Sequence, residues 1–240
     1  MKNTGMLATT ASFPILRSKE DVLRPPGAAS DFLSKCIRCG KCVEACPYDS
    51  IRFLGANSGL NIYTPYIDPV KTPCYLCRTT GTDGKSKPLD KYLRCGKACP
   101  TGALKPIPND IEVLSKLPKE MKIGTANLNR KLCVAWQFSF CGECYFNCPL
   151  KDKALLSRPP DEEVSRSGIS PYVNQKACIG CGRCVFVCPV RKFDAKFINE
   201  TNVPDYFQLR YGALVERIIA QNRDNAQLPA IRVLKNKSDR

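Results

Sequence analysis

The chain has 240 residues, of which 43% are hydrophobic, and its 37 Lys and Arg against 22 Asp and Glu give a formal charge of +15. It contains sixteen Cys and no His. The absence of His excludes a Rieske centre, a His-ligated haem, an HExxH zinc site and a Ser–His–Asp triad. The cysteines are compatible with a secreted disulfide scaffold or with a metal protein, and their spacing distinguishes the two.

Residues 1–30 form an N-terminal extension ahead of the first cysteine. Residues 1–18 contain Lys2 but no sustained apolar run and no twin arginine, so they do not resemble an export signal. No stretch of the sequence reaches the length of a membrane-spanning helix. We therefore expect a cytoplasmic location, with periplasmic delivery by co-export with a partner as the alternative. In the cytoplasm, cysteine patterns indicate metal more often than disulfides.

The first and last cysteine groups share the spacing C-x2-C-x2-C-x3-C-P of bacterial ferredoxins. They consist of Cys36, Cys39, Cys42 and Cys46, and of Cys178, Cys181, Cys184 and Cys188. In this spacing three cysteines can hold three corners of one [4Fe–4S] cube, and the fourth ligates a different cluster. We expect the fourth cysteine, which precedes Pro, to begin a helix. Gly40, Gly180 and Gly182 are expected to allow close approach of the backbone to sulfur.

The second and third cysteine groups are stretched versions of the same unit, and each also ends in Cys-Pro. They consist of Cys74, Cys77, Cys95 and Cys99, and of Cys133, Cys141, Cys144 and Cys148. Four groups of four use every cysteine in the chain, which neither a disulfide scaffold nor zinc ribbons would require. We therefore predict four [4Fe–4S] clusters, with all sixteen Cys as iron ligands.

Because the fourth cysteine crosses to another cluster, the motifs have to work in pairs. Sequential pairing joins the first motif to the second and the third to the fourth. Nested pairing joins the first to the fourth, with the second and third as an inner unit. Either pairing predicts an α+β fold of two bacterial-ferredoxin-like modules, each holding two [4Fe–4S] clusters, with short strands and helices and much irregular structure. The residues alone leave both pairings open.

The predicted domain plan follows the motifs. Residues 31–110 carry the first two motifs, 111–130 a linker, 131–203 the last two motifs, and 204–240 a C-terminal helix and basic tail. Within the first unit, the segment 78–94 is rich in Gly, Ser, Lys and Pro, which is typical of an exposed loop. A short helix over 108–118, capped near Asn109 and stopped by Pro118, is expected to link the two halves of the chain.

Three further groups of residues lie near or beyond the motifs. The aromatic residues Trp136, Phe138, Phe140, Tyr145 and Phe146 are expected to be ordinary core, and Arg38, Arg94 and Arg183 to be solvated charges. One face of a predicted C-terminal helix carries Phe207, Tyr211, Leu214, Val215, Ile218 and Ile219. We expect that face to pack on the chain's own core. The tail from Leu228 to Arg240 is basic and aperiodic, as is typical of an arm that lies along a neighbouring subunit or is disordered when free.

The positive charge first suggests a nucleic-acid partner. Thiolate-ligated clusters are anionic, however, and four oxidised clusters would lower the balance to roughly +7. The sequence has no array of aromatic residues on a basic face on which bases could stack. A basic nucleic-acid-binding protein with structural clusters is therefore the alternative from a different class, and no nucleic-acid partner is expected.

Several segments resemble the NapG/MauM ferredoxin-type family. They are Leu23–Ala28, Ala45–Asp49, Ser58–Gly59, Thr64–Tyr66, Cys99–Leu104 and the seven-residue gap between Cys133 and Cys141. The resemblance covers about residues 23 to 190. It implies four [4Fe–4S] clusters that pass electrons between a quinol-side component and a terminal oxidoreductase. It also implies a relation to the iron–sulfur subunits of the dimethyl sulfoxide reductase group, which favours nested pairing.

These observations predict an electron-transfer subunit of an oxidoreductase complex, not an enzyme in its own right. The expected partners are a larger catalytic subunit, such as a tungsten or molybdenum enzyme, and a second redox partner. A NapG-like relay between a quinol dehydrogenase and a periplasmic reductase is the alternative. Because cofactor binding supplies much of the folding free energy in such chains, we also expect removal of iron to unfold the protein.

Overall fold

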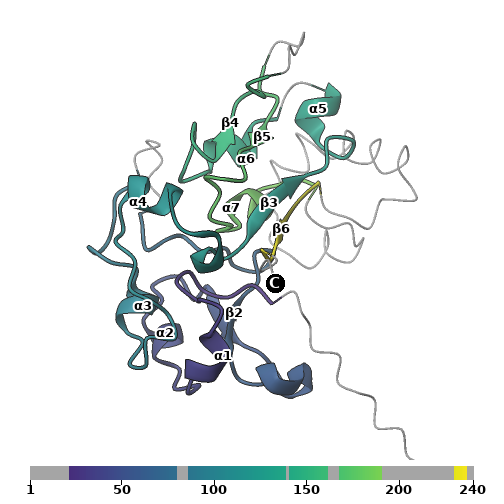
Figure 1. The fold of residues 1–240 in the computed structure, drawn as a ribbon. Coiled ribbons are helices and arrows are strands. Elements are labelled where there is room, and N and C mark those ends of the chain that lie inside the picture. The colour runs from purple at the N-terminus through teal and green to yellow at the C-terminus, as the bar shows by residue number, and fades with distance from the viewer. Residues whose placement is uncertain (1–21, 80–85, 139–140, 162–167, 191–229, 237–240) are drawn as a thin grey trace, which may run out of the picture.

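The computed structural model describes residues 22–79, 86–138, 141–161, 168–190 and 230–236. Within these ranges the helices and strands are short, and turns and extended segments join them (Figure 1). The predicted α+β fold with much irregular structure is confirmed. Figure 1 shows the N-terminal motifs gathered at one end of the molecule, in purple and blue, and the later motifs at the other, in teal and green.

The first module is a β-hairpin flanked by short helices. Its elements are α1 (Phe32–Lys35), α2 (Lys41–Glu44), β1 (Ile51–Phe53), the 3-10 helix η1 (Ala56–Asn61), β2 (Pro65–Ile67) and α3 (Arg94–Lys97). The antiparallel register places Ile51 opposite Ile67, and both side chains are buried. Directly opposite residues share one face of a hairpin, so this pair anchors the hairpin to the core. Helices α2 and α3 contact each other.

The second module repeats this order. Its elements are α5 (Val134–Phe138), α6 (Glu143–Phe146), β4 (Leu155–Leu156), β5 (Tyr172–Val173) and α7 (Arg183–Phe186). Strands β4 and β5 pair antiparallel, with Leu155 opposite Val173, and α6 contacts α7. Each module is therefore built from two consecutive motifs joined by a hairpin.

Every motif places its third cysteine inside a one-turn helix. These cysteines are Cys42 in α2, Cys95 in α3, Cys144 in α6 and Cys184 in α7. The fourth cysteine follows the end of the helix, so the prediction that it begins a helix is wrong. The Pro after it explains the difference, because a residue before Pro is disfavoured in the helical conformation. The Cys-Pro pair thus ends each turn.

The segment between the modules contains the predicted linker helix in a shorter form. Its elements are α4 (Ile111–Ser115), the 3-10 helix η2 (Lys119–Met121) and β3 (Thr125–Leu128). The N-cap of α4 is Asp110, whose carboxylate accepts the backbone N–H groups of Glu112 at 2.8 Å and Val113 at 3.2 Å. The cap lies one residue after the predicted Asn109, because Asn109 is buried and donates instead to the carbonyl oxygen of Cys77.

Part of the basic tail folds back onto its own chain. Residues Ile231–Leu234 form β6, which pairs antiparallel with β3 and places Ile231 opposite Leu128. Ile231 is buried, so burial of an apolar side chain holds the strand in place. For residues 231–234 the prediction of an arm along a neighbouring subunit is therefore wrong.

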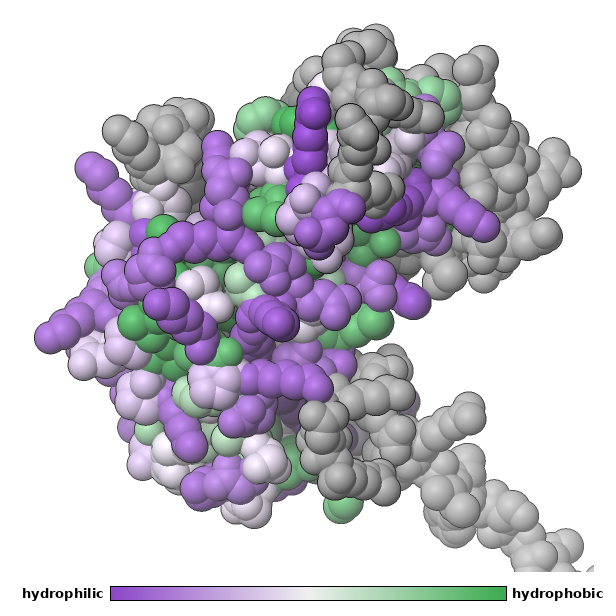
Figure 2. All heavy atoms as spheres, turned by 45° about the horizontal axis from the view of Figure 1, so that its top comes forward, coloured by the Kyte–Doolittle hydropathy of each residue, from purple (hydrophilic) through white to green (hydrophobic). Residues whose placement is uncertain are grey.

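The hydrophobic core is continuous across both modules. Among the described residues, Leu76 of the first module, Leu114 of α4 and Ile179 of the second module belong to one cluster of buried side chains. A smaller cluster surrounds Cys133 and Cys141. On the face shown in Figure 2, hydrophilic side chains cover most of the surface and apolar ones form small groups. Within the described ranges, no helix has the length and apolar character needed to cross a bilayer.

Several predictions concern residues outside the described ranges. These are residues 1–21 of the N-terminal extension, 80–85 of the predicted loop, Phe140, and the helix face running from Phe207 to Ile219. The described ends of the loop are not simply exposed: Thr79 donates its N–H to the carbonyl of Lys87, and Leu89 donates to the carbonyl of Cys77, both at 2.8 Å.

The aromatic residues of the third motif are not all core. Trp136 is half-buried and its indole N–H donates to the carbonyl of Pro171 at 3.1 Å. Phe138 and Tyr145 are also half-buried. Phe146 is 63% exposed on α6, so the prediction that it is core is wrong. Successive residues of a one-turn helix point in different directions. In α6 Cys144 points inward, and Phe146 points toward solvent.

Candidate metal centres

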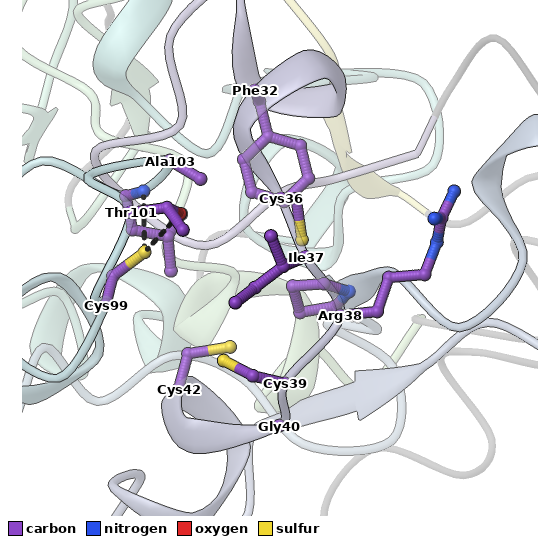
Figure 3. A pocket seen from close by; sticks show the side chains of 12 residues that line it. Phe32, Cys36, Ile37, Arg38, Cys39, Gly40, Cys42, Cys99, Thr101 and Ala103 are labelled. Atoms are coloured by element: carbon purple, nitrogen blue, oxygen red, sulfur yellow. Dashed lines mark hydrogen bonds between the residues drawn. The ribbon is translucent and has the colours of Figure 1, made fainter.

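The first hollow in the protein is lined by cysteines of two motifs. Cys36, Cys39 and Cys42 come from the first motif and Cys99 from the second, and we call this group site 1. Figure 3 shows their sulfur atoms facing one common space. Most of the other lining side chains are apolar, among them Phe32 and Leu104.

Two further hollows, both in the second module, are also lined by three cysteines of one motif and one of its partner motif. One, which we call site 3, is lined by Cys133, Cys141, Cys144 and Cys188. The other, which we call site 4, is lined by Cys148, Cys178, Cys181 and Cys184. The hollows of sites 1, 4 and 3 contain about 340, 380 and 320 Å³ of space, part of it open to solvent. Similar volumes and linings indicate that one kind of group fits all of them.

The remaining four cysteines interact with one another in the first module. Burial raises the pKa of Cys95, and the nearby thiols of Cys77 and Cys46 raise it further. Burial likewise raises the pKa of Cys74, and Cys95 and Cys77 add to that shift. We call Cys46, Cys74, Cys77 and Cys95 site 2. It repeats the rule of the other sites, with three cysteines from one motif and the fourth from its partner motif.

This exchange of the fourth cysteine establishes sequential pairing. Cys99 of the second motif reaches site 1 of the first, and Cys188 of the fourth motif reaches site 3 of the third. Nested pairing, which the family resemblance favoured, is wrong for this chain. The hairpins explain why: β1–β2 and β4–β5 are short connections that return each motif to the one directly before it.

Burial disfavours ionised thiols at these sites. Desolvation is the largest cause that raises the pKa of Cys42, Cys133 and Cys181, each to about 11. Such thiols would be neutral at pH 7, and a bound metal cluster would supply the positive charge that keeps them as thiolates. Among the described residues, no three or more His, Cys, Asp or Glu are gathered tightly enough for a single ion. At sites 1, 3 and 4 the cysteines instead line a hollow.

Backbone N–H groups donate hydrogen bonds to three of the cysteine sulfur atoms. Two of these cysteines are the fourth of their motif and one is the first. Ser50 donates to Cys46 Sγ, Leu104 to Cys99 Sγ and Ala126 to Cys178 Sγ, each at 3.4 Å. Such donors stabilise a thiolate and raise the potential of a cluster that it ligates.

The balance of these effects is visible at Cys99. Burial raises the pKa of Cys99, but hydrogen bonds from the backbone of Leu104 and from Thr101 outweigh burial, and the net shift is downward. The surroundings of Cys99 therefore stabilise its thiolate relative to an ordinary cysteine.

The loops around the cysteines need an unusual backbone. The residue before the second cysteine of a motif has positive φ in three motifs: +58° at Arg38, +54° at Leu76 and +74° at Gly180. Two of the predicted glycines also lie close to other segments of the chain. A Cβ at Gly180 would overlap the backbone of Gly124, and one at Gly182 would overlap Pro69.

These two glycines lie where the modules meet. At the same junction, Cys74 donates its N–H to the carbonyl oxygen of Cys181 at 2.8 Å. The guanidinium of Arg183 lies 5.3 Å from the ring centroid of Tyr75, and Tyr75 packs on Tyr48 at 4.6 Å. Sites 2 and 4 are therefore neighbours, and the spatial order of the sites is 1, 2, 4, 3.

The three arginines of the motif loops differ from one another. Arg38 is exposed, yet it donates to the carbonyls of Ile62 and Leu60 at 2.9 and 3.2 Å. Arg94 forms an ion pair with Asp90, and Arg183 stacks at the junction. The prediction of solvated charges therefore misses a structural contact in each case.

Arg78 is a residue whose position the sequence did not reveal. Its side chain is 5% exposed and donates four hydrogen bonds, to the hydroxyl and carbonyl of Ser86 and to the carbonyl and amide oxygen of Asn109. Asn109 in turn donates to the carbonyl of Cys77 at 3.0 Å. The only sequence signal was that this Arg directly follows a cysteine of site 2.

Comparison with known proteins agrees with this geometry. A family described as a 4Fe-4S dicluster domain matches residues 35–103 and 139–192, and a second family of the same description matches 170–230. Most of each module thus matches a domain type built for two clusters.

Individual relatives are ferredoxin-type proteins. The chain is 36% identical over 173 residues to the ferredoxin-type protein NapG of Escherichia coli, covering 69% of this chain and 65% of NapG. It is 34% identical over 188 residues to the methylamine utilization ferredoxin-type protein MauM of Methylorubrum extorquens, covering 77% of this chain and 76% of MauM. The chain spans a little under two-thirds of that NapG. It belongs to the NapG/MauM family of ferredoxin-type iron–sulfur proteins, which transfer electrons by means of [4Fe–4S] clusters.

Proposed function

We propose that the chain binds four [4Fe–4S] clusters, one at each of sites 1 to 4, and that all sixteen cysteines are iron ligands. The observation that carries this proposal is the repeated exchange of the fourth cysteine between consecutive motifs. That exchange is the ligation rule of two-cluster ferredoxins. Disulfide pairing would not need four cysteines around one hollow.

The four sites form a single relay in the order 1, 2, 4, 3. Within each module, the shared motifs place two sites next to each other. Between the modules, the hydrogen bond from Cys74 to Cys181 joins site 2 to site 4. When bound, the clusters accept and donate single electrons. The chain's own residues fix the spacing of the sites, exclude water from the buried thiols, and donate N–H groups to sulfur.

The relay serves a larger oxidoreductase as a non-catalytic subunit. We propose a tungsten or molybdenum enzyme as the catalytic partner, a second redox protein as the other, and a cytoplasmic location. The alternative is a relay of the kind found with NapG, between a quinol dehydrogenase and a periplasmic reductase. The similarity to both NapG and MauM supports an adaptable relay module, since proteins with these two different names are 36% and 34% identical to the chain.

Anaerobic purification from the native host tests the proposal. The holoprotein should contain about sixteen iron and sixteen sulfide per chain, as four [4Fe–4S] clusters require. Its partner subunit should carry tungsten or molybdenum. Stoichiometric zinc with little iron would refute the cluster assignment, and clusters that no co-purifying protein reduces or oxidises would refute the relay.

A further inference from the structure

Site 1 is the open end of the row of sites. All sixteen cysteines lie within the described residues, and Cys39 is the one that is exposed. Sites 2 and 4 are inside the row, and Cys133, Cys141 and Cys144 of site 3 are buried. Electron tunnelling to an external partner favours the cluster nearest the surface, so site 1 is the exit that the geometry offers.

Large apolar side chains in the same part of the first module are exposed. Leu60 is 84% exposed and Ile37 63% exposed, and Leu33 and Tyr63 are exposed as well. Ile37 lies between two ligands of site 1 and lines its hollow (Figure 3). We call Leu33, Ile37, Leu60 and Tyr63 the site 1 face.

The site 1 face is held together by the Arg38 side chain. Its hydrogen bonds to the carbonyls of Ile62 and Leu60 attach the segment of η1 to the loop that carries Cys39. Because these hydrogen bonds already order the two segments, binding a partner would cost less conformational entropy, which favours tight association. Exposed apolar side chains in one cluster mark sites of interaction.

Two exposed positive charges beside the face are not offset by an ion pair among the described residues. Arg38 and Lys41 are both exposed, and within the described residues neither forms an ion pair. Lys35, in contrast, is paired with Asp31. A partner that approaches this face is therefore steered by negative charge.

We propose that the site 1 face docks a redox protein whose own surface is apolar at its centre and acidic at its rim. This inference rests on the proposed relay function. On docking, one electron passes between the cluster of site 1 and the partner's redox centre, so that one is oxidised as the other is reduced. Leu60 and Ile37 provide the buried centre of the interface, and Arg38 and Lys41 its charged rim.

The apolar centre is tested with Leu60→Asp in the holoprotein, against Val113→Asp as the matched control. Val113 is 39% exposed on α4, away from site 1. The probe is the redox protein that co-purifies with the wild-type holoprotein. Leu60→Asp should weaken its binding by roughly tenfold or more, as burying a charge at an interface centre does, and Val113→Asp should not. Equal loss in both variants, no loss in Leu60→Asp, or no co-purifying redox protein would overturn the proposal.

The charged rim is tested with small oxidants of opposite charge. The reduced holoprotein is mixed with hexacyanoferrate(III), an anion, or with hexaammineruthenium(III), a cation, each of which takes one electron. At low ionic strength, Lys41→Gln should slow the reaction with the anion by about twofold and should not slow the reaction with the cation. Lys116→Gln, at the C-terminal end of α4, should change neither. If Lys41→Gln changed the rate of oxidation by the anion no more than Lys116→Gln does, site 1 would not be the place where electrons leave the protein.

Iron content and reversible reduction are measured on every variant first. A protein without clusters would refute the relay function itself. A protein with its full iron whose Leu60→Asp variant still binds the partner would refute only the docking face.

Discussion

At the scale of single residues, Arg78 places a positive charge in the interior beside site 2. Its four hydrogen-bond acceptors, on Ser86 and Asn109, are all neutral groups. Burial lowers the pKa of Arg78, but a guanidinium remains charged at any physiological pH. A nearby positive charge stabilises the reduced, more negative form of a cluster, so Arg78 would raise the potential of a cluster bound at site 2, and the neighbouring carboxylate of Asp110 would offset part of that effect.

Replacement of Arg78 should therefore lower the potential of one cluster. In Arg78→Met, we expect the reduced fraction of that cluster at a fixed potential to fall by about tenfold, a shift of roughly 59 mV for one electron. Arg78→Lys should restore part of the shift. Redox titration followed by electron paramagnetic resonance measures it, with iron content as the test of folding. Arg232→Gln is the control, since Arg232 is exposed on β6; an equal shift there would contradict the role of burial.

Gly180 is required by its backbone angle and by its neighbour together. Its φ is +74°, and an added Cβ would overlap the backbone of Gly124. We expect Gly180→Ala to destabilise the holoprotein by about 3 kcal/mol. Gly102→Ala should cost only about 1 kcal/mol, because Gly102 has a φ of +67° with nothing near the position of a Cβ. Thermal unfolding of the two variants compares them, and similar losses would show that the contact with Gly124 can relax.

At the scale of elements, the unit of construction is a one-turn helix, a hairpin and a second one-turn helix. The hairpin β1–β2 joins α2 to α3, and β4–β5 joins α6 to α7. The Cys-Pro end of each turn directs the fourth cysteine across to the hollow of the other motif. The position of a cysteine inside or after its one-turn helix thus determines which cluster it would ligate.

Serine replacements can read out this exchange. Cys99→Ser should alter the same cluster as Cys42→Ser, because both cysteines line site 1. Cys95→Ser, only four residues before Cys99, should alter a different one. Serine is a harder ligand than thiolate, so the affected cluster should be lost or should shift in potential. Paramagnetic resonance spectra of the three variants would decide the matter, and a shared signature for Cys99→Ser and Cys95→Ser would contradict the exchange.

The sequence predicted the ferredoxin-like modules, but it did not predict which cysteine motifs pair with one another. The spacing of Cys36 to Cys46 and of Cys178 to Cys188 indicated two ferredoxin-like modules, because that spacing is a local property of one loop. The pairing of motifs depends on which hairpin returns the chain, and neighbouring residues do not encode it visibly. Strand β6 was missed because four residues carry little pattern and their partner, β3, lies about a hundred residues earlier. Arg78 was missed because burial of a charge is a tertiary property.

At the scale of the whole molecule, cysteines are part of the core that holds the modules together. The main buried cluster includes Cys42, Cys95, Cys144 and Cys184 together with apolar side chains of both modules. Without clusters, their hollows would be voids lined by unsatisfied thiols. The free energy of cluster binding is therefore also free energy of folding.

Removal of iron should unfold the protein. Anaerobic chelation is expected to abolish most of the far-ultraviolet circular dichroism, because single-turn helices are not stable alone in water. The loss should follow the release of iron in time. A protein that keeps its native spectrum after full release of iron would show that the apolar core suffices.

The pairing of β6 with β3 also bears on the order in which the protein is made. Ile231 lines the hollow of site 3, and Ala230 donates its N–H to the carbonyl of Val190 beside it. A growing chain thus completes sites 1 and 2 long before the ribosome reaches the residue that closes site 3. Chains that end at residue 229 should load the first module and lack the cluster of site 3, which iron counts on the truncated protein would reveal. The last residues of the described chain would thus decide when the relay is complete, although they carry none of its cysteines.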